Sequence, residues 1–272
     1  MVIDESINGD ELMKLAITGK GGVGKTTVAS LLARLYALEG KSVLAIEANP
    51  DGNLASALGM PPEVYQKITP IAEMHDLIEE RTGARPGAPA PFFRLNPKVD
   101  DIPDAFSATK DGIKLLVMGT VKQAGTGCMC PESALLRSLM QHLILQRGEV
   151  VIFDMDAGVE HLARGTAQSV DAFIIVVEPG RRSLQTADSI RRLAKDLGIT
   201  KIYVIGSKVR SDEDRKFVIE NMPDYEILGF LSYSQGITDA DLKGASAFDV
   251  DAKAVEEIEA IKQKLESKFA QR

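Results

Sequence analysis

The sequence predicts a doubly wound α/β fold, in which helices cover both faces of a mostly parallel sheet of about seven or eight strands. Three observations carry this prediction. Short apolar runs alternate along the chain with stretches whose apolar residues recur at helical spacing. The runs are apolar at consecutive positions, which is typical of strands buried on both faces. The composition, 44% hydrophobic and 26% charged over 272 residues, is that of a globular chain with a sizeable core.

The expected strands and helices follow one another in order. The first strand, 14–18, ends in glycines and leads into a helix at 26–39, which Gly40 closes. The remaining expected strands are 42–46, 113–118, 150–153, 173–177, 202–205 and 227–231. The remaining expected helices are 132–146, 183–197, 212–221 and 252–269. These elements predict one domain over 13–272, with a proline-rich, irregular insertion at 60–111 that is partly helical at 63–82, and with a disordered extension at 1–12.

The charge and hydropathy of the chain limit the expected partners and cellular location. The net charge is -7, so no nucleic acid is expected as the main partner. The start of the chain is acidic, and no apolar run approaches the ~20 residues that span a bilayer, so we expect a cytoplasmic protein with no membrane partner. The last helix gathers apolar residues on one face and is expected to pack on the sheet, with membrane contact as the alternative. These residues are Val255, Ile258, Ile261, Leu265 and Phe269.

A phosphate-binding loop is the strongest motif. Residues 19–26 fit G-x-x-x-x-G-K-[ST] between an expected strand and an expected helix, so the fold is that of a phosphate-loop NTPase. Glycines let the backbone N–H groups surround phosphates, Lys25 is expected to reach the β- and γ-phosphates, and Thr26 is expected to bind Mg²⁺. The sequence therefore predicts ATP or ADP with Mg²⁺. The expected nucleotide-binding residues of this loop are Gly19, Gly21, Gly22, Val23, Gly24, Lys25, Thr26 and Thr27.

A second lysine inside this loop indicates which class of phosphate-loop NTPase the chain resembles. With Lys20 the loop is KGGVGKTT, and it resembles the deviant phosphate loop of the MinD, ParA and nitrogenase-iron-protein superfamily of dimeric ATPases. The resemblance implies a homodimer with two ATP molecules between its subunits. It also implies a catalytic role for Lys20, which would cross the interface and contact the partner's nucleotide, adding positive charge where phosphoryl transfer spreads negative charge.

Residues 47–54 resemble the first switch of that superfamily, D-x-D-P-x-x-N, with Glu47 and Asn49 at the two aspartate positions. The resemblance places at Asn49 the catalytic carboxylate that orients or deprotonates the attacking water. An amide accepts a hydrogen bond but is no general base, so we expect intact ATP binding and slow hydrolysis to ADP and phosphate. Whether Asn49 is natural or an introduced substitution stays open.

Two later segments resemble the rest of the superfamily's site. Asp154 ends an expected strand and opens DMDAG, like the second switch D-x-x-x-G. The resemblance implies that Asp154, a catalytic residue, holds a water on Mg²⁺, and that the Gly158 N–H senses the γ-phosphate. Ser207 and Lys208 stand where the superfamily often has Asn-Lys, which implies adenine contacts that the serine weakens.

The two cysteines of the chain, Cys128 and Cys130, form a C-x-C pair just before an expected helix. Two thiolates fill half of a four-coordinate site, and a two-fold dimer would supply four, a set suited to Zn²⁺ or to Ni²⁺. Buried, reduced cysteines are the alternative interpretation.

Further segments give a narrower resemblance, to the CooC/AcsF family of nickel-inserting maturation ATPases. The matching segments are 14–29, 68–78, 95–100, the C-x-C, 154–167 and 176–179. The resemblance implies that ATP closes the dimer around one metal held by Cys128 and Cys130 of both subunits. It implies that hydrolysis frees nickel for the client, carbon monoxide dehydrogenase or acetyl-CoA synthase.

Two other functions stay open. The first is a MinD- or ParA-like positioning ATPase that acts on membrane or DNA. The second is an electron-transfer ATPase like the nitrogenase iron protein, which needs cluster cysteines from two separated segments, whereas this chain has both in one segment.

Overall fold

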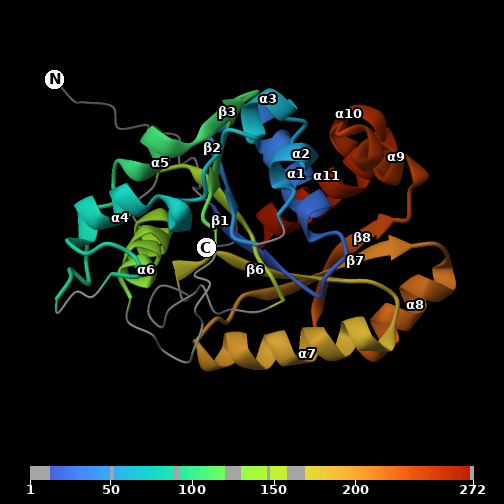
Figure 1. Cartoon of the computed structure of the whole chain (residues 1–272). Coiled ribbons are helices and arrows are strands. Elements are labelled where there is room, and N and C mark those ends of the chain that lie inside the picture. Colours follow the sequence, from blue (N-terminus) through green and yellow to red (C-terminus); the bar gives the residue numbers. More distant parts are fainter. Residues whose placement is uncertain are drawn as a thin grey trace, which may run out of the picture.

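The structure, a computed structural model, describes residues 13–49, 52–88, 92–119, 130–145, 148–157 and 169–269. Within these ranges the strands form one eight-stranded sheet in the order β3-β4-β2-β5-β1-β6-β7-β8 (Figure 1). The neighbouring strands are parallel, except that β3 runs antiparallel to β4. The predicted fold class, a doubly wound α/β fold with a mostly parallel sheet, is thereby confirmed.

Each of the predicted strands is present, with boundaries shifted by a few residues at most. They are β1 (Lys14–Thr18), β2 (Val43–Glu47), β4 (Ile113–Val117), β5 (Val150–Asp154), β6 (Ala172–Val177), β7 (Ile202–Val209) and β8 (Glu226–Ser232). The strand that the sequence missed is β3 (Ala108–Lys110). With three partly exposed residues at the sheet edge, it is too short to show a hydropathy pattern.

The predicted helices are present as well. They are α1 (Lys25–Leu38), α6 (Pro131–Leu145), α7 (Arg181–Asp196), α8 (Asp212–Asn221) and α11 (Ala252–Ser267). Four shorter helices were not predicted: α2 (Leu54–Ala57), α5 (Ile102–Phe106), α9 (Gln235–Lys243) and α10 (Ala247–Val250).

The helical part of the insertion is broken. It consists of α3 (Pro62–Tyr65), a 3₁₀ turn (Ile71–Glu73) and α4 (His75–Thr82). Pro70 separates the first two, because a residue before proline disfavours the helical conformation. Ile71 and Ile78 are buried in the same hydrophobic cluster as Ile46 of the sheet. The insertion therefore shares a core with the sheet.

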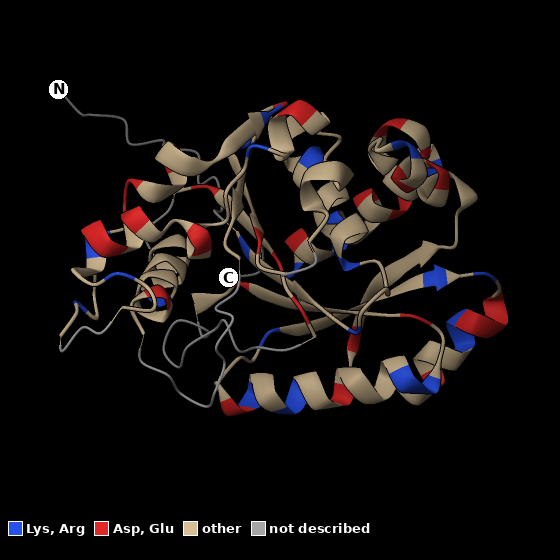
Figure 2. Ribbon diagram, viewed as in Figure 1, with Lys and Arg blue, Asp and Glu red and all other residues tan. Residues whose placement is uncertain are grey.

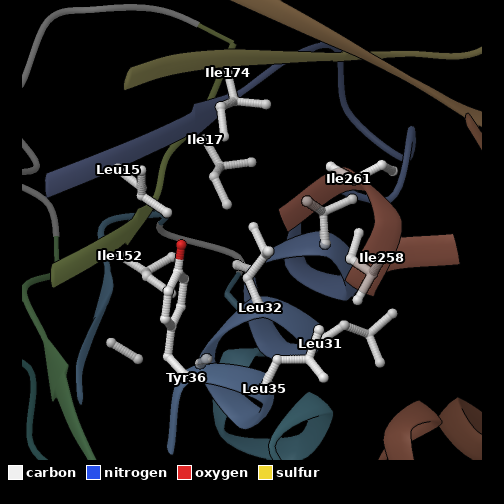
Figure 3. Close-up of a cluster of buried hydrophobic side chains, with 14 of the residues drawn as sticks. Leu15, Ile17, Leu31, Leu32, Leu35, Tyr36, Ile152, Ile174, Ile258 and Ile261 are labelled. Atoms are coloured by element: carbon white, nitrogen blue, oxygen red, sulfur yellow. The ribbon is translucent and has the colours of Figure 1, made fainter. Parts of the chain in front are cut away.

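One face of the sheet packs against α1 and α11. Leu15 and Ile17 of β1 point toward these helices, and Figure 3 shows them beside Leu32 and Ile261. All four side chains are at most 1% exposed. The last helix therefore packs on the sheet as predicted. None of the helices within the described residues is long and apolar enough to cross a membrane.

The opposite face of the sheet buries Ala16, Phe153 and Phe173 under α6 and α7. Strands that are apolar on both faces explain the unbroken apolar runs in the sequence. Charged residues lie mainly on the helices and loops, and α7 carries both signs on its surface (Figure 2). The prediction of disorder for 1–12 concerns residues outside the described ranges.

Candidate nucleotide-binding site

The glycines of the loop after β1 give its backbone a shape that other residues rarely adopt. Gly22 and Gly24 have φ angles of 80° and 99°, in the left-handed region that favours glycine. A β-carbon at Gly19 would lie 2.3 Å from the carbonyl oxygen of Val176, so the loop can approach β6 only with glycine there. Val23 is fully buried and anchors the loop in the core. The loop therefore needs glycine at 19, 22 and 24 to keep this shape.

A cavity of about 480 Å³ opens in front of the loop. Eight of the predicted nucleotide-site residues line it: Gly21, Gly22, Gly24, Lys25, Thr26, Thr27, Asn49 and Lys208. Gly19 and Val23 belong to the loop but do not line the cavity. Ser207 is also buried and lies against Gly24, where a β-carbon would be 3.0 Å from its Oγ.

Other lining residues were not found from the sequence. They come from α1, α2, the end of β5 and the α9–α10 region: Ser30, Asn53, Ser56, Ala57, Asp156, Ile237, Thr238, Ala240, Asp241, Ala245 and Ala247. Ser234, whose hydroxyl caps the start of α9, is a local signal that could have indicated that helix. Nothing local indicates that α9 lies beside the phosphate loop, about 200 residues earlier in the chain.

Thr26 and Asp154 form a polar pair beside the cavity that fits Mg²⁺. The Thr26 hydroxyl donates a hydrogen bond of 2.6 Å to Oδ2 of Asp154, and Oδ1 of Asp154 is buried with no hydrogen-bond partner. Burial raises the pKa of Asp154 to about 6, while the bond from Thr26 and the charge of Lys25 lower it. A hydroxyl and a carboxylate oxygen are ligands that Mg²⁺ prefers, directly or through water. Bound here, Mg²⁺ would supply positive charge to the phosphates.

Glu47 is the second buried acid at this edge of the sheet. It ends β2 opposite Asp154 of β5, and it is 4% exposed. Its carboxylate oxygens accept hydrogen bonds from the N–H groups of Leu54 (2.8 Å) and Asn49 (3.2 Å). Burial, and then the charge of Asp154, raise the pKa of Glu47 to about 8.

Two lysines flank the loop. Lys20 pairs with Glu178 at 3.7 Å, and both side chains are about one-third exposed, so the pair holds Lys20 only weakly. The Lys208 ammonium donates to the carbonyl oxygen of Gly22. Lys208 also has a φ of 56°, a conformation uncommon for a residue other than glycine and found at functional sites. It therefore ties the end of β7 to the phosphate loop.

Cys130 directly precedes α6, which begins at Pro131, and proline is favoured at the first position of a helix. Cys130 is partly exposed, its Sγ lies 3.1 Å from the Ser133 hydroxyl, and its carbonyl accepts the N–H of Ala134 at 3.0 Å. Cys128 and Gly158 lie outside the described residues. Within the described ranges, no three His, Cys, Asp or Glu side chains are grouped so that they could hold a metal ion.

The chain is similar to known proteins over most of its length. The model of the CobQ/CobB/MinD/ParA nucleotide-binding domain matches residues 14–247. The carbon monoxide dehydrogenase accessory protein CooC of Rhodospirillum rubrum is 49% identical over 238 residues, which are 88% of this chain and 90% of CooC. The chain belongs to the CooC family.

Other relatives agree with this assignment. An ATP-binding protein of Methanocaldococcus jannaschii is 47% identical to this CooC-family chain over 92% of this chain and 96% of that protein. Among solved structures, the MinD cell division protein of Aquifex aeolicus superposes with a TM-score of 0.66 over 94% of this chain and 97% of that chain. At 22% identity, MinD shares the fold. The CooC-family chain thus carries a nucleotide-binding domain of the CobQ/CobB/MinD/ParA family.

Proposed function

We propose that this protein is an ATP-driven, homodimeric chaperone that delivers nickel to carbon monoxide dehydrogenase or acetyl-CoA synthase. The observation that carries the proposal is the 49% identity with a carbon monoxide dehydrogenase accessory protein along 88% of the chain. The phosphate loop, its Thr26–Asp154 pair and the cysteine at the start of α6 supply the groups that such a function needs.

ATP binds in the cavity in front of the phosphate loop. The loop N–H groups and Lys25 hold the phosphates, while Thr26 and Asp154 hold Mg²⁺ and its water. The base lies toward Lys208 and the α9–α10 wall of the cavity. Lys20 leaves Glu178 when a second subunit approaches and contacts the partner's nucleotide, where its charge stabilises phosphoryl transfer.

Hydrolysis is slow, because the residue that faces the cavity from the first switch is an amide. Asn49 lines the cavity but accepts no proton from the attacking water. Slow turnover lets the ATP-bound dimer persist while it holds its cargo.

Nickel is the cargo of this cycle. Each subunit contributes Cys128 and Cys130. The closed dimer therefore offers four thiolates to one nickel ion, whereas each subunit of the open form offers only two. ATP thus changes the number of thiolate ligands that nickel can reach, and the affinity for nickel changes with that number.

The test measures nickel stoichiometry and oligomeric mass together, with and without Mg-ATP. The unchanged chain is compared with Cys128→Ala/Cys130→Ala and with Met129→Ala, a control in the same segment that keeps both thiols. We expect one nickel per dimer, bound more tightly with ATP, in the unchanged chain and in the control, and none in the double variant. Lys20→Ala should bind ATP as a monomer and fail to form the ATP-dependent dimer.

Metal binding that does not depend on the thiols, in every nucleotide state, would contradict the proposal. ATP-dependent binding to liposomes or to DNA would then support a positioning ATPase instead. Iron bound as a coloured cluster would point to electron transfer.

A further inference from the structure

The backbone that follows β2 is fixed on one side by the sheet and on the other by the Glu47 side chain. The N–H of Ala48 donates to the carbonyl oxygen of Asp154 at 3.0 Å, so residue 48 still belongs to the strand ladder. The next described N–H, that of Asn49, donates to the Glu47 carboxylate. At Asn49 the backbone N–H therefore bonds to a side chain rather than to a neighbouring strand.

The same carboxylate also holds the start of α2. Asn53 stands at the N-cap position of that helix but makes no capping hydrogen bond with its side chain. The N–H of Leu54 instead donates to Oε2 of Glu47 at 2.8 Å. Exposed N–H groups at a helix start need such acceptors. Glu47 thus replaces the missing cap.

Gly52 makes room for this arrangement. A β-carbon at Gly52 would lie 1.9 Å from Cδ of Glu47 and 2.2 and 2.3 Å from its two oxygens. The backbone of Gly52 is not left-handed, so a side chain there would meet no conformational strain. A side chain at 52 would therefore have to displace the Glu47 carboxyl group.

The segments that Glu47 ties together form one wall of the nucleotide cavity. Asn49, Asn53, Ser56 and Ala57 all line it, whereas Glu47 does not. A displaced carboxylate would release Asn49 and the start of α2 together.

We propose that Glu47 is a positioning residue, which with Gly52 holds Asn49 and α2 against the nucleotide. Glu47 acts through the N–H groups of Asn49 and Leu54 and not by touching the nucleotide. The effect is greatest for the γ-phosphate, which the proposed function places beside Asn49, and in this respect the inference rests on that function. The Glu47 side chain occupies the space that a side chain at position 52 would need.

A double-mutant cycle tests the pair in the full-length protein. The variants are Gly52→Ala, Glu47→Ala and the double variant Glu47→Ala/Gly52→Ala. Gly180→Ala is the control, because Gly180 also has an ordinary extended backbone and a β-carbon there would meet no atom within 4 Å. For each, we would measure the Kd for Mg-ADP and for a non-hydrolysable Mg-ATP analogue, and the urea midpoint.

We expect Gly52→Ala to weaken binding of the ATP analogue about tenfold and binding of Mg-ADP much less, because the displaced Glu47 side chain no longer accepts the hydrogen bonds from Asn49 and Leu54. In the Glu47→Ala background the same change should alter the Kd by less than about twofold, because the group it meets has gone. The control should behave like the unchanged chain. If Gly52→Ala does not fold, a folded double variant that binds like Glu47→Ala supports the pair equally well.

Equal losses from Gly52→Ala in both backgrounds would overturn the inference, because Glu47 would then not be the group that excludes a side chain. Equal losses for Mg-ADP and the analogue, parallel to a fall in the urea midpoint, would also overturn it by showing a merely structural role. If neither variant with Ala at 52 folds, the inference fails too. An unchanged chain that binds ATP but no nickel would overturn the proposed function alone, whereas one that binds no ATP would overturn both.

Discussion

The two ends of the central strands hold buried charges in different ways. At the amino ends, Glu149 lies 3.1 Å from the Lys114 ammonium and 3.0 Å from the Ser42 hydroxyl, and Lys14 donates to its carbonyl oxygen at 2.7 Å. At the carboxyl ends, the acids Glu47 and Asp154 stand opposite each other on adjacent strands.

This difference indicates that the buried charges at the amino ends are structural and that those at the carboxyl ends are functional. Glu149 is neutralised by opposite charge and by hydrogen bonds, which is how a fold tolerates a buried ion. Burial raises the pKa of both Glu47 and Asp154, and the charge of Asp154 raises that of Glu47 further. Such perturbed neighbours cost stability and cluster at sites where a ligand or metal completes the charge balance. Changes at the carboxyl ends should alter nucleotide chemistry, and changes at the amino ends should alter stability.

The largest effect is expected from Asn49→Asp. A carboxylate at this position can accept the proton of the attacking water, so ATP turnover with Mg²⁺ should rise about 100-fold or more, as general bases contribute. Steady-state phosphate release measures the change. The control is Asn221→Asp, at the exposed end of α8, which should leave turnover unchanged. Equal turnover for the Asn49→Asp variant and the unchanged chain would mean that Asn49 is not what limits hydrolysis.

Lys25→Ala should weaken ATP binding by roughly 10- to 150-fold, the usual range for losing a hydrogen bond to a charged group. Lys25 is 5% exposed and lines the cavity, so it contributes through its contact with phosphate. Calorimetric titration measures the affinity, and Lys216→Ala, with a side chain 72% exposed on α8, is the control. Unchanged affinity in Lys25→Ala would place the phosphates elsewhere.

At the other end of the strands, Glu149→Ala should lower the free energy of unfolding by about 1–3 kcal/mol, because Lys114 and Ser42 lose a buried partner. Part of the Lys114 charge stays paired with Asp104 at 2.7 Å, which limits the loss. Urea denaturation measures it, and Glu220→Ala on the surface is the control. The ATP affinity should not change, and a change would mean that the two ends are coupled.

A pH dependence of stability is also expected. The pKa of Glu47 is about 8 in the folded chain against an ordinary 4.5, so between these values the folded state binds the extra proton. The free energy of unfolding should therefore fall as the pH rises through that window, by at most about 1.4 kcal/mol per pH unit from this group. Denaturation without Mg²⁺ at several pH values measures the slope.

Glu47→Gln, which cannot ionise, should flatten that slope. Asp154 contributes a similar slope over a narrower window at lower pH, up to its pKa of about 6, and it remains in the variant. A variant as steep as the unchanged chain above pH 6 would show that Glu47 does not titrate in this range.

Features that rest on neighbouring residues could be predicted from the sequence. The apolar runs of the strands and the glycines of the phosphate loop each express local chemistry. Thr26 and Asp154 were both predicted to lie at Mg²⁺, because both residues belong to motifs with defined positions, and the structure places them within hydrogen-bonding distance.

Features that rest on contacts between distant residues could not be predicted in this way. The edge strand β3 depends on pairing with β4, the α9–α10 wall depends on where the C-terminal part of the chain packs, and Lys20 meets Glu178 only across the fold. Glu47 was recognised as a departure from a motif, but its hydrogen bonds and its fit to Gly52 needed coordinates.

The fold class and the phosphate loop could be read from the sequence, because periodicity and backbone conformation depend on residues close together in the chain, and the family could be read from its motifs. The walls that complete the cavity and the buried acid that holds the first switch became visible only in the folded chain. Both depend on residues far apart in sequence that parallel strands bring to the same edge of the sheet.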